Sequence, residues 1–157
     1  MYIQRKFLLD VFKCRNLYLG VYREPFTRVM ELTDLELISV EGASEIWSFR
    51  QTLGGLRGRL IDVVGYLHDD PISLNGHGQT YMITRQDYTL ALLFPGSPFQ
   101  INLNEVRHKE LNKEEKSYYP SAWPKEMVSR VIRYKWKNII ILDEAFLLKQ
   151  IGLRAGQ

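Results

Sequence analysis

Basic and aromatic side chains alternate along one late stretch of the chain, which reads RVIRYKWKN. Five basic residues lie between Lys125 and Lys137, against a single acid, Glu126. Cations of this kind follow the phosphates of a single-stranded nucleic acid, while flat rings stack on its bases at about 1 to 3 kcal/mol each. The same residues also suit the solvated face of a surface element, because most charged side chains lie at protein surfaces.

Two earlier segments carry the same mixture, one in the glycine-rich centre of the chain and one in the strand pair that follows it. Together with the late stretch they form the predicted nucleic-acid-binding set: Arg59, Tyr66, Tyr81, Arg85, Arg130, Arg133, Tyr134, Lys135, Trp136 and Lys137. Within this set we expect Arg59, Arg133 and Lys135 to meet phosphates. The rings of Tyr66, Tyr81 and Trp136 are expected to stack on bases.

Other chemistry-bearing groups are weaker candidates. The histidines and carboxylates between His68 and His77 suggest metal binding or acid-base work in a small hydrolase, yet their spacing matches no metal signature and their Asp-Asp-Pro and Asn-Gly sequences are typical of an exposed turn. The apolar run before Asp143 and Glu144 resembles the magnesium-binding strand of nucleotide hydrolases, but the chain lacks the GxxxxGK[ST] phosphate loop. We therefore predict no catalytic residue, no metal and no cofactor.

Length and composition predict one ordinary globular domain. The 157 residues are 45% hydrophobic and 25% charged, with a net charge of +3, which suits a single domain spanning residues 1–157 with a substantial core. The lone cysteine, Cys14, favours a reducing compartment. No apolar stretch approaches the roughly 18 to 20 residues that a membrane helix needs. The prediction is a cytoplasmic protein without a membrane partner.

Most of the predicted elements are strands. Helical spacing of apolar residues predicts a helix over residues 3–12. Two short strands are expected around Thr33-Asp34. Further strands are predicted over residues 16–22, 45–52, 53–70 with a glycine bend, 81–85, 88–94, 99–106 and 139–142. Residues 125–136 fit a helix or a strand equally well, and residues 143–148 either continue the last strand or begin a helix.

The strand order from residue 53 onward resembles that of an OB-fold. The segments that carry this resemblance are GLRGRLIDVVGYL, TYMITRQDYTLALLF, VSRVIRYKW and NIIILDEAFLLK. The resemblance covers residues 53–151 and leaves residues 1–52 as an N-terminal extension of a helix and strands. It implies a mainly β, β-rich α+β fold: a small OB-like barrel with one or two helices. The alternative is an α+β fold with a C-terminal helix-strand unit.

The function predicted from the sequence is binding rather than catalysis. An OB-like barrel implies a ligand groove across its middle strands, where oligonucleotides and sometimes proteins bind. The first hypothesis is a non-enzymatic protein that binds single-stranded DNA or RNA. The alternative is a protein-protein interaction module, such as an adaptor, a subunit or a toxin-neutralising partner, without nucleic-acid binding. Salt separates the two, because phosphate contacts release counterions.

Overall fold

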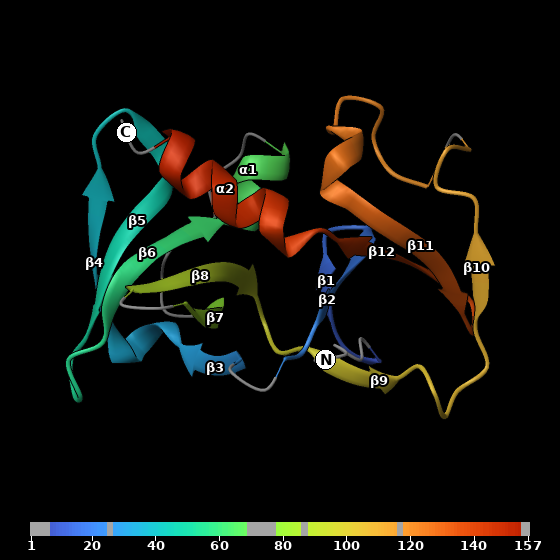
Figure 1. The fold of residues 1–157 in the computed structure, drawn as a ribbon, viewed down its shortest axis with the longest axis horizontal. Helices are drawn as coiled ribbons and strands as arrows, with labels where there is room; N and C mark the ends of the chain where they lie inside the picture. The colour runs from blue at the N-terminus through green and yellow to red at the C-terminus, as the bar shows by residue number, and fades with distance from the viewer. Residues whose placement is uncertain (1–6, 25–26, 69–77, 86–87, 116–117, 155–157) are drawn as a thin grey trace, which may run out of the picture. The chain divides into compact units, whose positions relative to one another are not determined.

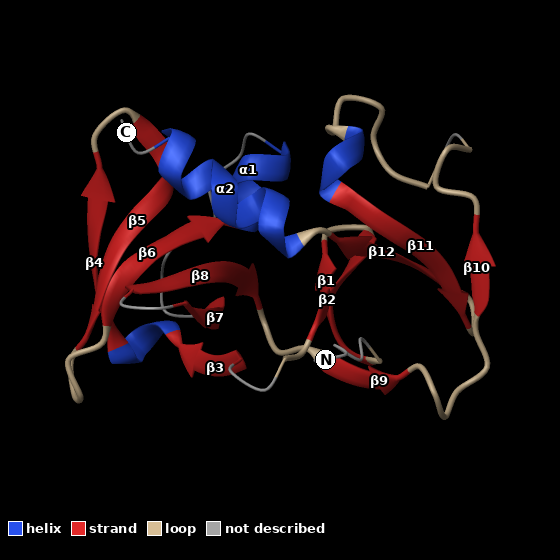
Figure 2. Cartoon of the chain, viewed as in Figure 1, coloured by secondary structure: helices blue, strands red, loops and turns tan. Residues whose placement is uncertain are grey.

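Strands make up most of the residues that the structure describes. The computed structural model describes residues 7–24, 27–68, 78–85, 88–115 and 118–154 (Figure 1), and the helices among them are short (Figure 2). The prediction of a mainly β fold with one or two α-helices is confirmed. Contacts divide the chain into two compact units, each assembled from two separate segments. The first unit comprises residues 1–25 and 98–144, and the second comprises residues 26–97 and 145–157.

The first unit is built on a six-stranded sheet. Its elements are β1 (Leu8–Cys14), β2 (Leu17–Tyr22), β9 (Phe99–Asn102), β10 (Lys109–Leu111), the 3-10 turn η2 (Lys125–Met127), β11 (Val128–Tyr134) and β12 (Lys137–Leu142). The strand order is β10-β11-β12-β2-β1-β9. Strands β1 and β2 form one antiparallel hairpin and β11 and β12 another. The two hairpins join through the parallel pair β12 and β2.

The second unit has a six-stranded sheet of its own and two helices. Its elements are β3 (Thr27–Glu31), the 3-10 turn η1 (Leu32–Asp34), β4 (Leu35–Val40), β5 (Ala43–Gln51), β6 (Arg57–Asp62), α1 (Val63–His68), β7 (Gly78–Arg85), β8 (Tyr88–Pro95) and nearly all of α2 (Glu144–Arg154). The strand order is β3-β7-β8-β6-β5-β4. Strands β6 and β8 are parallel, and the other neighbours are antiparallel.

Chain connectivity requires the sheet of the second unit to curl. Its two outermost strands, β3 and β4, follow one another in the chain and are joined by the three residues of η1. A flat six-stranded sheet would hold its edges roughly 24 Å apart at about 4.8 Å per strand. The η1 connection spans at most about 14 Å, so the edges bend toward each other. In the first unit the edge strands β9 and β10 are also consecutive, but the six residues between them are long enough to span a flat sheet.

Each unit encloses its own apolar core. The cluster in the first unit contains Leu9, Val11, Tyr22, Ile101, Leu103, Ile132, Ile139 and Ile141. The cluster in the second unit contains Leu32, Leu35, Phe49, Leu60, Met82, Ala91 and Leu93. Residues of β9, β11 and β12 thus share one core with residues of β1 and β2. Some members of this core, such as Leu9 and Ile132, are more than one hundred positions apart in the sequence.

Several predicted elements are confirmed and others are corrected. The strands around Thr33-Asp34 and the hairpin of residues 81–94 are present. The helix predicted over residues 3–12 is wrong where the structure describes it, because residues 8–14 form β1. Leu9, Val11 and Phe12 are all fully buried, so both faces of β1 are covered. A strand buried on both faces does not alternate, and its continuous apolar run imitates helical spacing.

Other boundaries also differ from the prediction. The long bent strand predicted over residues 53–70 is instead β6 followed by α1. The Asp62 Oδ1 atom accepts a hydrogen bond of 2.9 Å from the Gly65 amide, which satisfies an amide at the helix start and stops the strand. Residues 125–136 resolve into η2 and then the strand β11, and α2 begins at Glu144. The strand predicted over residues 99–106 ends at Asn102, where a turn begins.

The predicted extension, residues 1–52, does not stand outside the sheets. Four of its five strands pair with strands that follow residue 52: β1 with β9, β2 with β12, β3 with β7 and β5 with β6, while β4 pairs with β5. The strand order therefore differs from that of a barrel formed by residues 53–151 alone. The prediction of a single domain over residues 1–157 stays a prediction. No helix within the described ranges is long and apolar enough to cross a membrane.

Candidate protein-binding surface

The ten residues of the predicted nucleic-acid-binding set fall into two groups in different units. Six of them lie on the β11–β12 hairpin of the first unit: Arg130, Arg133, Tyr134, Lys135, Trp136 and Lys137. The other four, Arg59, Tyr66, Tyr81 and Arg85, lie in the second unit on β6, α1 and β7. The structure therefore places the first group on one hairpin of the first unit and the second group in the other unit.

The second group does not present the stacking rings that the sequence suggested. Tyr81 is fully buried, because β7 lies between β3 and β8 inside the sheet, so its ring cannot stack on a base. Arg59 and Tyr66 are half-buried on β6 and α1. Arg85 is the last residue of β7. The interpretation of Tyr81 as a stacking residue is wrong.

Arg130 is held within the protein. Its guanidinium donates to both carboxylate oxygens of Glu110 on β10, with the Nε–Oε1 distance at 2.9 Å, and to the Tyr22 hydroxyl at 2.7 Å. These contacts tie the edge strand β10 to β11. The hydrogen bonds with Glu110, followed by those with Tyr22, raise the pKa of Arg130 above its ordinary value despite partial burial. Arg130 therefore stabilises the sheet, and its positive charge is already paired with the Glu110 carboxylate.

The two hairpin turns of the first unit lie side by side. Strand β12 runs parallel to β2 with Ile139 opposite Tyr18, so the turns that precede these strands, at Arg15-Asn16 and Lys135-Trp136, lie at the same end of the sheet. We call residues 13–18 and 133–138 together the hairpin end. Each turn begins with a long basic residue at positive φ, 57° for Arg15 and 56° for Lys135. Glycine favours this conformation, and other residues adopt it at a cost.

The charge of the hairpin end has one sign. Its two stretches, KCRNLY and RYKWKN, contain Lys13, Arg15, Arg133, Lys135 and Lys137 and no acidic residue. Arg133 is also directly opposite another cation, Lys109 on β10. The Arg133 Nε atom donates to the side-chain oxygen of Asn138 at 3.1 Å, which leaves its charge uncompensated by that contact. Several like charges on one sheet end create a local positive potential.

Aromatic side chains accompany these cations, but most of them are already covered. The Lys135 Nζ atom lies 5.2 Å from the centre of the Tyr134 ring. The Lys137 Nζ atom lies 5.7 Å from that of Tyr18. The Tyr18 ring also meets Phe99 edge to face at 6.3 Å. Trp136 differs, because it is 94% exposed and makes no ring or cation contact within the described part of the chain.

Sequence reasoning missed half of the hairpin end. Lys13, Arg15 and Tyr18, and the neighbouring Phe99, were not among the predicted residues. The predicted helix over residues 3–12 concealed β1, and with it the two-residue turn that joins β1 to β2. The available signal was the similarity of the two stretches FKCRNLYL and IRYKWKNI, each a basic two-residue turn between apolar strands. A turn of this length between apolar runs predicts a hairpin.

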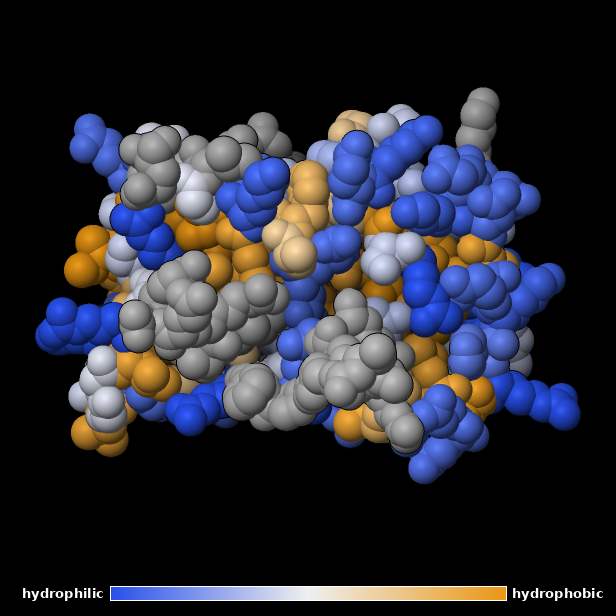
Figure 3. Space-filling view, viewed as in Figure 1, coloured by the Kyte–Doolittle hydropathy of each residue, from blue (hydrophilic) through white to orange (hydrophobic). Residues whose placement is uncertain are grey.

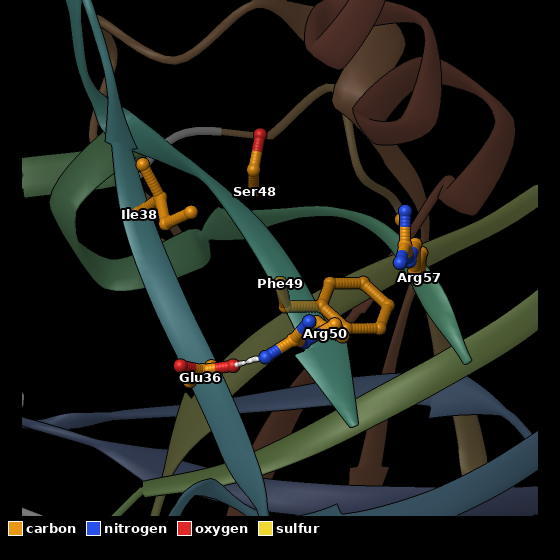
Figure 4. Close-up of a pocket in the computed structure, with 7 residues that line it drawn as sticks. Glu36, Ile38, Ser48, Phe49, Arg50 and Arg57 are labelled. Carbon is orange, nitrogen blue, oxygen red and sulfur yellow. Dashed lines mark hydrogen bonds and ion pairs between the residues drawn. The ribbon is translucent and has the colours of Figure 1, made fainter. Parts of the chain in front are cut away.

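Two hollows elsewhere are lined by both acidic and basic side chains. One of about 450 Å³ lies on β4, β5 and β6 of the second unit and is lined in part by Ile38, Ser48 and Arg57. Glu36 and Arg50 face each other there and form an ion pair (Figure 4). The other, in the first unit, is lined in part by Tyr119 and Trp123, whose rings stack at 6.1 Å, and by the ion pair of Lys125 with Glu114 at 3.5 Å. Neither has the one-signed charge of the hairpin end.

The remaining sequence candidates gain no support as sites. The loop proposed for a hydrolase, between His68 and His77, lies outside the described residues except at its first member. Cys14 is buried. Among the residues that the structure describes, no group of three or more His, Cys, Asp or Glu side chains is placed to hold a metal ion. Among the coloured residues of Figure 3, hydrophilic side chains take up more of the surface than hydrophobic ones.

Comparisons with known proteins identify the fold. No family model matches the chain, and no curated protein sequence matches it. Among solved structures, the scaffolding protein TtCheW from Thermoanaerobacter tengcongensis is similar, with a TM-score of 0.61 and 13% sequence identity. The match covers 90% of this chain and 87% of that one. At this identity the likeness establishes a shared β-rich fold over nearly the whole chain.

Proposed function

We propose that this chain is a non-enzymatic adaptor that binds other proteins, and that the hairpin end is one of its binding surfaces. The observation that carries the proposal is Trp136, a large aromatic side chain left 94% exposed at the tip of a hairpin. Tryptophan is enriched among the few residues that dominate binding energy at protein interfaces. An exposed tryptophan on a two-residue turn provides such an anchor, because its side chain has two rotatable bonds and loses little conformational entropy on binding.

The fold supports the same function. The similar structure is described as that of a scaffolding protein, and the likeness extends over both units of this chain. Fold alone does not establish function. The likeness does favour the protein-interaction hypothesis over the nucleic-acid hypothesis. The hairpin end is the specific surface that we assign to this interaction.

Photo-crosslinking tests the proposal. A photoreactive amino acid placed at Asn16, an exposed residue in the turn beside Trp136, should form discrete crosslinks to one or a few proteins in the native cell. Those crosslinks should disappear when Trp136→Ser is added. The control position is Leu53 in the second unit, which is 82% exposed and should not give the same products. Identical products from both positions would contradict the proposal.

The nucleic-acid hypothesis has a direct test. Fluorescence anisotropy with labelled single-stranded DNA and RNA, measured at low and high salt, should give no saturable binding to the chain. Saturable binding that weakens steeply with salt, and that Arg133→Ala removes, would reverse the order of the two hypotheses.

A further inference from the structure

We propose that the hairpin end recognises an acidic protein segment that carries an apolar side chain, with the apolar group against Trp136 and the carboxylates against the surrounding cations. This inference rests on the proposed adaptor function and specifies the chemistry of the partner. Three independent features of the hairpin end lead to it: its charge, its backbone strain and the state of its aromatic rings.

The charge of the hairpin end selects an acidic partner. Five basic residues and no acid lie within residues 13–18 and 133–138, and they come from two hairpins that are adjacent only because β2 and β12 pair in parallel. A cluster assembled from two separate segments is not explained by one basic stretch of sequence. Complementary charge steers association and disfavours basic partners, which pay a like-charge penalty.

The backbone strain indicates that the long cations at the two turns have a use. Arg15 and Lys135 both occupy the first position of a two-residue turn at positive φ, where glycine is the favoured residue. Strained positions of this kind concentrate at binding and catalytic sites. Both turns place an exposed basic side chain at the same end of the sheet, so the two strained positions both lie within the basic hairpin end.

The state of the rings favours a protein over a single-stranded nucleic acid. Base stacking along a single strand uses successive open ring faces. Here Lys135 lies over Tyr134, Lys137 lies over Tyr18, and Tyr18 also packs edge to face with Phe99. Of the three rings within residues 13–18 and 133–138, Trp136 is the exposed one, at 94%. One open ring among cations matches one apolar anchor flanked by carboxylates, rather than a run of stacked bases.

Peptide binding to the intact chain tests this inference. The probe is a short labelled peptide in which glutamates flank a central pair of leucines, and nuclear magnetic resonance reports which backbone amides it perturbs. We expect the shifts to centre on residues 13–18 and 133–138. Trp136→Ser should weaken binding by about tenfold, while Lys135→Ser combined with Lys137→Ser should weaken it by about threefold and reduce its salt dependence.

Matched controls separate the two recognition elements. Replacing the leucines of the peptide by serines should cost as much affinity as Trp136→Ser, and replacing the glutamates by glutamines should remove the salt dependence. Leu53→Ser and Lys149→Ser, which change exposed residues in the second unit, should leave binding unchanged. Equal binding of the glutamine peptide would overturn the inference, as would tighter binding of oligothymidylate to the same amides.

The outcomes distinguish this inference from the proposed function. If crosslinking at Asn16 captures partners in a Trp136-dependent manner but the acidic peptide does not bind, the partner chemistry is wrong and the adaptor function stands. If the peptide binds at the hairpin end but no protein crosslinks there in the native cell, the recognition chemistry stands and the adaptor function fails.

Discussion

Lys135 places a positive charge on the surface at a backbone position that lowers the stability of the fold. Its φ of 56° lies in the left-handed region, which costs non-glycine residues roughly 1–2 kcal/mol. We expect Lys135→Gly to raise the free energy of unfolding, by up to about 1 kcal/mol after the greater entropy of the unfolded glycine chain is subtracted. Urea denaturation of the variant and the parent chain measures the difference.

The control for Lys135→Gly is the same substitution two positions later. Lys137 begins β12 and has no positive φ, so Lys137→Gly should lower the free energy of unfolding by about 0.5–1 kcal/mol. If the free energy of unfolding rises in Lys135→Gly and falls in Lys137→Gly, the turn is strained. Equal losses would show that Lys135 contributes to stability through its contact with Tyr134 instead.

At the scale of residues, the sequence predicted charge better than exposure. The basic residues from Arg130 to Lys137 are contiguous, so their clustering is visible without a structure. Whether a cation is paired depends on partners far along the chain, as with Arg130, Glu110 and Tyr22. Tyr81 failed as a predicted site residue for a similar reason, because burial follows from the position of β7 within the sheet.

At the scale of elements, close packing between strands depends on Gly20 in β2. A methyl group added there would lie 3.1 Å from side-chain atoms of Leu9 and Ile139, both of which are fully buried and have little room to move. Gly20→Ala should therefore lower the free energy of unfolding by about 1–3 kcal/mol through overpacking. Chemical denaturation measures this loss.

Gly152 supplies the matched control for Gly20→Ala. It lies in α2 with nothing within 4 Å of an added methyl group. Alanine is a better helix former than glycine, so Gly152→Ala should raise the free energy of unfolding by about 0.5–1 kcal/mol. If both alanine variants are equally stable, the close approach of Leu9 and Ile139 to β2 relaxes without cost.

Element types were predicted well where the pattern is local and poorly where burial is complete. The β7–β8 hairpin has a two-residue connection between apolar runs, and it was found. β1 was mistaken for a helix, because its two buried faces erase the alternation of a strand. The start of α1 was missed because one side-chain contact, from Asp62 to the Gly65 amide, ends the strand.

At the scale of the whole molecule, the sheet order was out of reach of the sequence pattern. Most of β1 was expected as a helix and β2 as a strand of an N-terminal extension, yet they pair with β9 and β12, which follow the segment that builds most of the second unit. Periodicity describes which faces are apolar and says nothing about which distant strand will cover them. The resemblance of residues 53–151 to a barrel was a match of local strand patterns, and these do not encode pairing.

A double-mutant cycle tests whether the separate segments of the first unit share one core. Val11 on β1 and Ile141 on β12 are both in register with Gly20 on β2 and belong to the same buried cluster. Val11→Ala and Ile141→Val should each lower the free energy of unfolding. The loss in the double variant should differ from the sum of the two single losses by about 0.5–1 kcal/mol, because Val11 and Ile141 face each other across a residue without a side chain.

The control pair is Val11→Ala with Leu60→Val, since Leu60 belongs to the core cluster of the second unit. The losses of this pair should add within roughly 0.3–0.5 kcal/mol. Additivity in the first pair would mean that β1 and β12 contribute independently, and the two-segment core would have to be abandoned.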